Sequence, residues 1–168
     1  MLIFYYKYLI LIIILLFHKI FKINNCNEII PNIYIGNAWS SILNYKDFDV
    51  IVNVTKDIEF PEKFEKTKIR IPVDDLYIFK NQDIKNYLNY IDGLQELYNQ
   101  NKKILIHCRC GIQRSGFITQ LLLMKILNIN QEQTINLIQN KSSLKFVSNN
   151  FILNNLHNVN KNFKKYLL

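Results

Sequence analysis

The sequence has little of what disulfide-stapled scaffolds and zinc sites need. Its 168 residues include 3 cysteines, 4 glycines and 3 prolines. Cys108 and Cys110 form a Cys-x-Cys pair and Cys26 stands alone, so there is neither a disulfide framework nor a second Cys or His pair to complete a zinc site. The composition is globular, not collagen-like or disordered, and no internal repeat is visible. We therefore expect one domain in a reducing, intracellular compartment.

Acidic residues are also scarce, with 13 Asp and Glu against 21 Lys and Arg, a formal charge of +8. This excess favours an anionic partner, such as a phosphoprotein, a nucleic acid or an acidic lipid. The chain has no zinc-finger spacing or RNA-binding motif, and its aromatic and basic residues do not interleave as a nucleic-acid surface requires. A nucleic-acid partner is therefore not expected.

One apolar run stands out near the start of the chain. Ten uninterrupted apolar residues separate Lys7 from His18, and Leu2–Phe21 would approach the roughly 20 residues of a spanning helix if Lys7 reached the membrane surface. No small-residue cleavage site follows, which argues against a signal peptide. The run must be buried in a membrane, in its own core or in a partner subunit. We expect residues 1–24 to form this helix and residues 25–168 to form the folded domain.

Hydrophobic periodicity predicts alternating strands and helices. A short strand, a glycine turn and the start of a helix are expected after Pro31, and Asp83 is a candidate N-cap for a later helix. Further strands are expected at 49–55, 68–73 and 102–108, and helices at 83–98, 115–127, 131–140 and 149–166. This order predicts an α/β fold, with a small mixed sheet of four to five strands flanked by helices.

The residues that carry chemistry gather between Ile106 and Gly116, in the stretch IHCRCGIQRSG. The stretch joins a predicted buried strand to a predicted buried helix. The backbone N–H groups of such a loop point inward at an anion, and the helix N-terminus adds unpaired donors and about half a positive charge. A Walker loop is excluded, because its Lys followed by Ser or Thr is missing. We expect a phosphate cradle made by Arg109, Cys110, Gly111, Ile112, Gln113 and Arg114.

Cys108 lies at the base of this cradle. A thiol among inward amides, close to a helix N-terminus and an arginine, ionises readily and is then a nucleophile. Arg114 has the planar fork that holds two phosphate oxygens while charge builds in the transition state. Gly111 lets the backbone approach the anion, and Ser115 can donate a hydrogen bond to the sulfur as it leaves. A merely structural cysteine would leave the glycine and the strand-to-helix placement unexplained.

The spacing of this loop, His-Cys, five residues, Arg-Ser, resembles the signature of the cysteine-based protein phosphatases. Its fixed elements are all present, namely His107, Cys108, Gly111, Arg114 and Ser115. Similarity to the dual-specificity branch covers roughly residues 30–156: VIVNVT resembles a core strand, and IYIGN an element whose asparagine, here Asn37, braces the phosphate loop. The resemblance implies hydrolysis of phosphotyrosine and phosphoserine or phosphothreonine through a phosphocysteine, without metal or cofactor.

A phosphocysteine route also needs an acid, because an alkoxide or phenoxide leaves poorly. The stretch RIPVDDLYIF supplies Asp74 and Asp75 on a loop after a strand. In the dual-specificity branch the acid occupies the fifth position of an I-P-x-x-D pattern, which implies Asp75. Asp74 remains the alternative, and whichever is not the acid is a solvated loop carboxylate.

The N-terminal part is similar to small poxviral members of this branch in the type and separation of three elements: Tyr6–Leu9, His18–Lys19 and Gly36–Asn37. In those proteins the N-terminal helix swaps between subunits. The resemblance implies a homodimer through residues 1–24, and a place in the virion and host cytoplasm if the protein is viral, or otherwise an intracellular one. A membrane anchor remains the alternative.

Other functions use the same loop. The loop resembles that of the phosphoinositide phosphatases in having a basic residue, Arg109, directly after the nucleophile. Their second basic residue is missing here, near the position of Gln113. An RNA 5′-phosphatase would suit the positive charge. A phosphate-binding pseudophosphatase is the non-enzymatic alternative, disfavoured because the nucleophile, the arginine and candidate acids are all present.

Overall fold

The computed structural model describes residues 26–73 and 81–142, without the side chains of 81–85. The predicted N-terminal helix, both candidate acids Asp74 and Asp75, and the predicted helix at 149–166 lie outside the described residues. Among the described residues, no helix is both long and apolar enough to cross a membrane.

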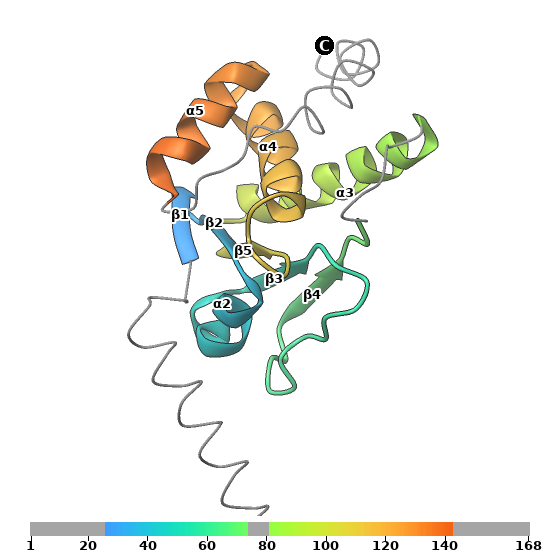
Figure 1. The fold of residues 1–168 in the computed structure, drawn as a ribbon, viewed down its shortest axis with the longest axis vertical. Coiled ribbons are helices and arrows are strands. Elements are labelled where there is room, and N and C mark those ends of the chain that lie inside the picture. Colours follow the sequence, from blue (N-terminus) through green and yellow to red (C-terminus); the bar gives the residue numbers. More distant parts are fainter. Residues whose placement is uncertain (1–25, 74–80, 143–168) are drawn as a thin grey trace, which may run out of the picture.

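A mixed five-stranded sheet forms the centre of the domain, in the order β1-β2-β5-β3-β4 (Figure 1). The strands are β1 (Cys26–Ile30), β2 (Ile33–Gly36), β3 (Val50–Asn53), β4 (Thr67–Arg70) and β5 (Ile104–His107). The edge strand β1 runs antiparallel to β2, and the other neighbouring strands are parallel. This confirms the predicted α/β class with its small mixed sheet.

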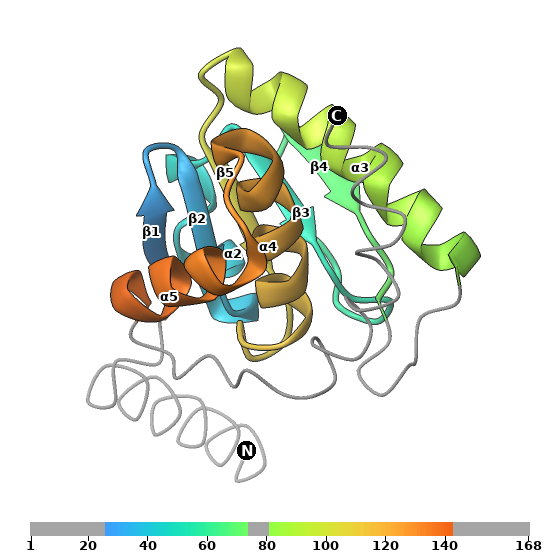
Figure 2. The same cartoon turned by 90° about the horizontal axis from the view of Figure 1, so that it is seen from above.

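Helices cover both faces of the sheet. On one face lie α3 (Asn81–Asn99), α4 (Arg114–Leu127) and α5 (Gln131–Lys141), and on the opposite face lies the short α2 (Ala38–Leu43), followed by the 3-10 turn η1 (Tyr45–Asp47). Figures 1 and 2 show this arrangement, with α2 separated from the other helices by the strands.

The strand predicted at 102–108 forms β5, at the centre of the sheet. Its four residues are all buried. Ile104 and Ile106 belong to the large core under α3 and α4, while Leu105 packs with Phe48 and Ile51 in a smaller core on the other face. Because successive strand residues point to opposite faces, a continuous apolar run is stable only where both faces are covered.

The predicted N-cap at Asp83 is wrong. Helix α3 begins at Asn81, two residues earlier, so Asp83 occupies a position inside the first turn. A carboxylate in a first turn still interacts favourably with the helix dipole, which is why the sequence pattern marks the region but not the boundary. Helix α4 likewise begins one residue earlier than predicted, at Arg114.

Four strands end at the same edge of the sheet. Gly36 at the end of β2 and Asn53 at the end of β3 are both Cα partners of His107 at the end of β5, and Asn53 is also paired with Arg70 at the end of β4. The loops that follow these strands therefore leave the sheet side by side. In open α/β sheets ligands bind at this carboxyl edge, so the fold places the candidate site here.

Candidate active site

Cys108 is the first residue after β5 and only 2% of it is exposed. Its Sγ accepts a hydrogen bond from the backbone N–H of Gly111, with an N to Sγ distance of 3.2 Å. The hydroxyl of Ser115, at the start of α4, lies 3.3 Å from the same sulfur. The loop thus folds back around the sulfur and presents two donors that can stabilise negative charge on it.

Gly111 cannot be replaced without moving the loop. Its φ is +75°, and a Cβ added there would lie 2.7 Å from the carbonyl carbon and oxygen of Gly36 and 2.9 Å from the backbone nitrogen of Asn37. Side chains do not tolerate such contacts, and a positive φ disfavours them independently. The glycine therefore lets the cysteine loop pack against the end of β2.

Arg114 is the first residue of α4, and its side chain is largely buried. The residue before it, Gln113, makes no side-chain capping hydrogen bond to the helix. The first N–H groups of a helix have no partner within the helix, and they carry its partial positive charge. The arginine and the start of α4 can therefore hold an anion in front of Cys108.

Asn37 caps a different helix. Its side-chain Oδ1 accepts hydrogen bonds from the backbone N–H and the hydroxyl of Ser40, at 2.9 and 3.0 Å, and so caps α2. The next residue, Ala38, donates its backbone N–H to the carbonyl oxygen of Arg109, at 3.3 Å. The structure thus places Asn37 beside the cysteine loop, and a backbone hydrogen bond ties this segment to the loop.

The loop after β3 was not predicted to belong to the site. Asp57 on this loop forms an ion pair with Arg109, directly after the nucleophile candidate. The two residues are 52 positions apart, so no local pattern connects them. The one available signal is the position of Asp57 shortly after a buried parallel strand, where polar residues gather near ligands.

Comparison with known proteins agrees with this geometry. Residues 33–162 match the catalytic domain of the dual-specificity phosphatases. The chain belongs to this family. Its members are protein-tyrosine/serine/threonine phosphatases, and the family expected from the cysteine loop is confirmed.

Among the relatives, protein 123R of Invertebrate iridescent virus 6, named as a tyrosine phosphatase, is 27% identical over 128 residues, 74% of this chain and 85% of that protein. Human dual specificity protein phosphatase 9 is 30% identical over 125 residues, 69% of this chain, but the match spans only 31% of the human protein. Crystalline human DUSP28 shares the fold with a TM-score of 0.72 at 13% identity, over 83% of this chain and 95% of its own.

The histidine of the phosphatase loop, His107, is fully buried and neutral, and we expect it to make the domain less stable in acid. Burial, and then the charge of Arg70, lower the pKa of His107 from 6.5 to about 4. Between these values the unfolded chain binds a proton that the folded chain does not. The free energy of unfolding is therefore highest above pH 6.5, as far as His107 is concerned. It decreases as the pH falls from 6.5 towards 4, by roughly 3 kcal/mol in total. An NMR titration of the His107 ring in the folded protein checks this, and a midpoint near 6.5 would contradict it.

The acid of the phosphatase mechanism is expected on the loop after β4. Ile71 and Val73 are buried, and the Ile71 N–H donates to the Asn53 carbonyl at 3.0 Å, which extends the pairing of β4 with β3 by one residue. Asp74 and Asp75 follow directly in the sequence. Within the described residues, no group of three or more His, Cys, Asp or Glu side chains is placed to hold a metal ion.

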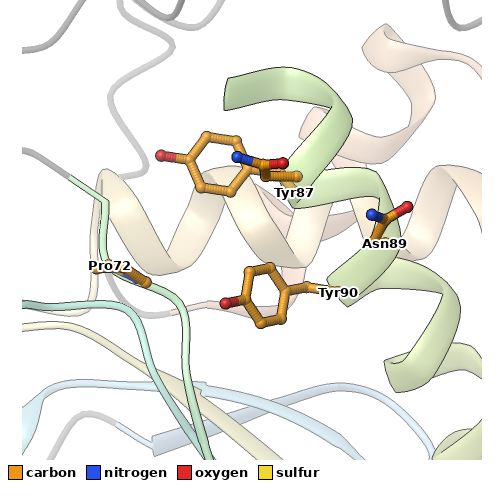
Figure 3. Close-up of a pocket in the computed structure, with 5 residues that line it drawn as sticks. Pro72, Tyr87, Asn89 and Tyr90 are labelled. Carbon is orange, nitrogen blue, oxygen red and sulfur yellow. The ribbon is translucent and has the colours of Figure 1, made fainter. Parts of the chain in front are cut away.

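A pocket of about 500 Å³ lies between this loop and α3, lined by Pro72, Asn86, Tyr87, Asn89 and Tyr90. Figure 3 shows the rings of Tyr87 and Tyr90 pointing from α3 towards Pro72. The Tyr87 ring also packs edge-on against Phe117 of α4, with the centroids 6.0 Å apart. Among the described residues, those that line this pocket belong to α3 and to the segment after β4, and none belongs to the cysteine loop.

Proposed function

We propose that this domain removes phosphate from phosphotyrosine and from phosphoserine or phosphothreonine in proteins, through a phosphocysteine intermediate and without a metal ion. The observation that carries the proposal is the buried Cys108 sulfur, held by the N–H of Gly111 and the hydroxyl of Ser115 at 3.2 and 3.3 Å. A sulfur in contact with a backbone N–H and a hydroxyl, near the start of a helix without a side-chain cap, is suited to carry negative charge.

In the first step the Cys108 thiolate attacks the phosphorus and the bond to the substrate oxygen breaks. Arg114 and the amides of the loop bind the nonbridging oxygens, where charge is concentrated during the transfer. Asp75 donates its proton to the departing oxygen, so that an alcohol or phenol leaves in place of an anion.

In the second step water attacks the phosphorus of the phosphocysteine, and the Asp75 carboxylate, now unprotonated, accepts a proton from that water. The sulfur departs with its negative charge stabilised by Ser115 and Gly111. His107 acts as a positioning residue in this proposal, because its buried ring is neutral and its carbonyl accepts the N–H of Val54 at 2.8 Å, which joins the start of the loop to β3.

The phosphoinositide alternative loses support from the loop sequence. Its loop chemistry relies on two basic residues, but the position of the second is held by Gln113 here. The single extra arginine, Arg109, provides less positive charge than a polyphosphorylated lipid headgroup requires, which favours a phosphoprotein substrate.

The proposal predicts that the purified full chain releases phosphate from phosphotyrosyl and phosphothreonyl peptides in EDTA with dithiothreitol. Chelation is expected to leave the rate unchanged, because nucleophile, clamp and acid are all side chains. The measurement is phosphate release with and without chelator, together with a 5′-phosphorylated RNA as a competing substrate. Activity that disappears with EDTA and returns with zinc or magnesium, or a strong preference for the RNA, would contradict the proposal.

A further inference from the structure

An exposed ion pair lies beside the cysteine loop. Arg109 directly follows Cys108, and its guanidinium pairs with the carboxylate of Asp57 on the loop after β3. The side chains are 61% and 56% exposed, respectively. The pair therefore bridges two loops at the edge of the sheet and remains accessible to solvent and to a substrate.

Both partners are held in place by their backbones. The Arg109 carbonyl accepts the N–H of Ala38 at the start of α2, at 3.3 Å. On the other side, Asn53 closes the turn that contains Asp57 by donating from Nδ2 to the carbonyl of Ile58, at 2.7 Å. These hydrogen bonds fix the backbone positions from which the two side chains extend.

Two further hydrogen bonds stiffen the same turn. The hydroxyl of Thr55 donates to Asn53 Oδ1 at 2.7 Å, and Arg70 Nη1 donates to the Thr55 carbonyl at 3.0 Å. Arg70 itself stacks over the ring of Phe60, 5.1 Å from its centroid. The loop that carries Asp57 is therefore anchored to β3 and β4.

Asp57 is ionised near the catalytic loop. Burial opposes this ionisation, but hydrogen bonds from its own backbone and from Arg109, with the nearby charges of Arg109 and Arg114, lower the pKa of Asp57 below its ordinary value. Because Asp57 pairs with Arg109 and Arg109 directly follows Cys108, this negative group lies beside the loop that would bind the substrate phosphate. A second anion beside that phosphate would be attracted by Arg109, and Asp57 would compete with it for the guanidinium.

We propose that Arg109 recognises a second anionic group beside the phosphate that is cleaved, such as an acidic side chain next to the phosphorylated residue of a peptide, and that Asp57 is the counter-ion which this group displaces. The inference rests on the proposed function and adds the substrate class to it. Exchange is feasible because an exposed ion pair contributes little net stability, while the arginine fork binds a carboxylate bidentately.

The test compares two phosphotyrosyl peptides that differ only in their neighbouring residues, glutamate in one and alanine in the other. The readout is the ratio of their kcat/KM values, measured on the full chain at low salt. Asp57→Asn should raise the ratio about two- to fivefold, mostly through KM, which is the range of effects expected for one exposed ion pair. Arg109→Ala should lower it by a similar factor, and both changes should shrink at high salt.

Asp92→Asn is the matched control. Asp92 of α3 pairs with Lys125 of α4 on the surface. The substitution Asp92→Asn therefore removes a surface ion pair away from the site. Its ratio should equal that of the unaltered chain.

Two failures can be told apart. If Asp57→Asn and Arg109→Ala change both peptides by the same factor, or match the Asp92→Asn control, Arg109 does not read the neighbouring group, and the phosphatase proposal stands. If the unaltered chain hydrolyses neither peptide, the phosphatase proposal fails and the role of Arg109 fails with it.

Discussion

Replacement of Cys108 by serine is expected to abolish turnover while phosphate binding survives. A serine hydroxyl does not ionise near neutral pH, so the nucleophile is lost. The groups that would bind the phosphate remain, because the other amides of the loop and the side chain of Arg114 belong to unchanged residues. The unaltered chain and Cys108→Ser are therefore nearly isosteric, and they differ in the charge that the attacking atom can carry.

The measurement combines phosphopeptide turnover with equilibrium binding of a phosphotyrosyl peptide to the inactive variant. Cys26→Ser provides the matched control, since Cys26 lies on β1 and burial raises its pKa to about 11, so it stays protonated at neutral pH. The control should keep full activity. Turnover in Cys108→Ser near that of the control would refute the assignment of the nucleophile.

Substitution of the general acid should lower the rate of hydrolysis nearly as much, but only for some substrates. Asp75→Asn is expected to slow hydrolysis of phenyl and alkyl phosphates about 10²- to 10⁴-fold, the usual contribution of general acid catalysis. A substrate whose leaving group is already strongly acidic should be affected far less, because it departs without a proton. The dependence on the leaving group is the signature of an acid, and a variant with disturbed structure would not show it.

We expect Asp75 to reach the site, because the intervening chain is long enough. Asp75 follows Arg70, the last residue of β4, by five residues, enough chain for about 17 Å. Only β3 separates β4 from β5, so their ends lie about 10 Å apart. Asp74→Asn is the matched control at the neighbouring position. If that variant shows the dependence on the leaving group and Asp75→Asn does not, Asp74 is the acid.

Much of the catalytic loop could be predicted because its chemistry is local. Cys108, Gly111 and Ser115 lie within one short stretch, and the strand before it is recognisable from its apolar residues. Strand β1 was not predicted, because only one of its five residues is buried. Its position depends on antiparallel pairing with β2, which apolar periodicity does not record.

Contacts between distant segments could not be predicted in the same way. The Asp57–Arg109 pair joins residues 52 positions apart, and the link from Ala38 to the Arg109 carbonyl uses backbone atoms that any residue type could supply. The capping role of Asn37 towards Ser40 is local and could have been found, since an asparagine followed three residues later by serine is a plausible start of a helix.

The central claim is that phosphate passes through the sulfur of Cys108. The most direct test is to mix the full chain with a phosphotyrosyl peptide, stop the reaction in acid within the first turnover and locate the phosphate by mass spectrometry. We expect one phosphate on the proteolytic peptide that contains Cys108, and none in Cys108→Ser. Rapid turnover with Cys108 unmodified at every time point, or phosphate on another residue, would contradict it.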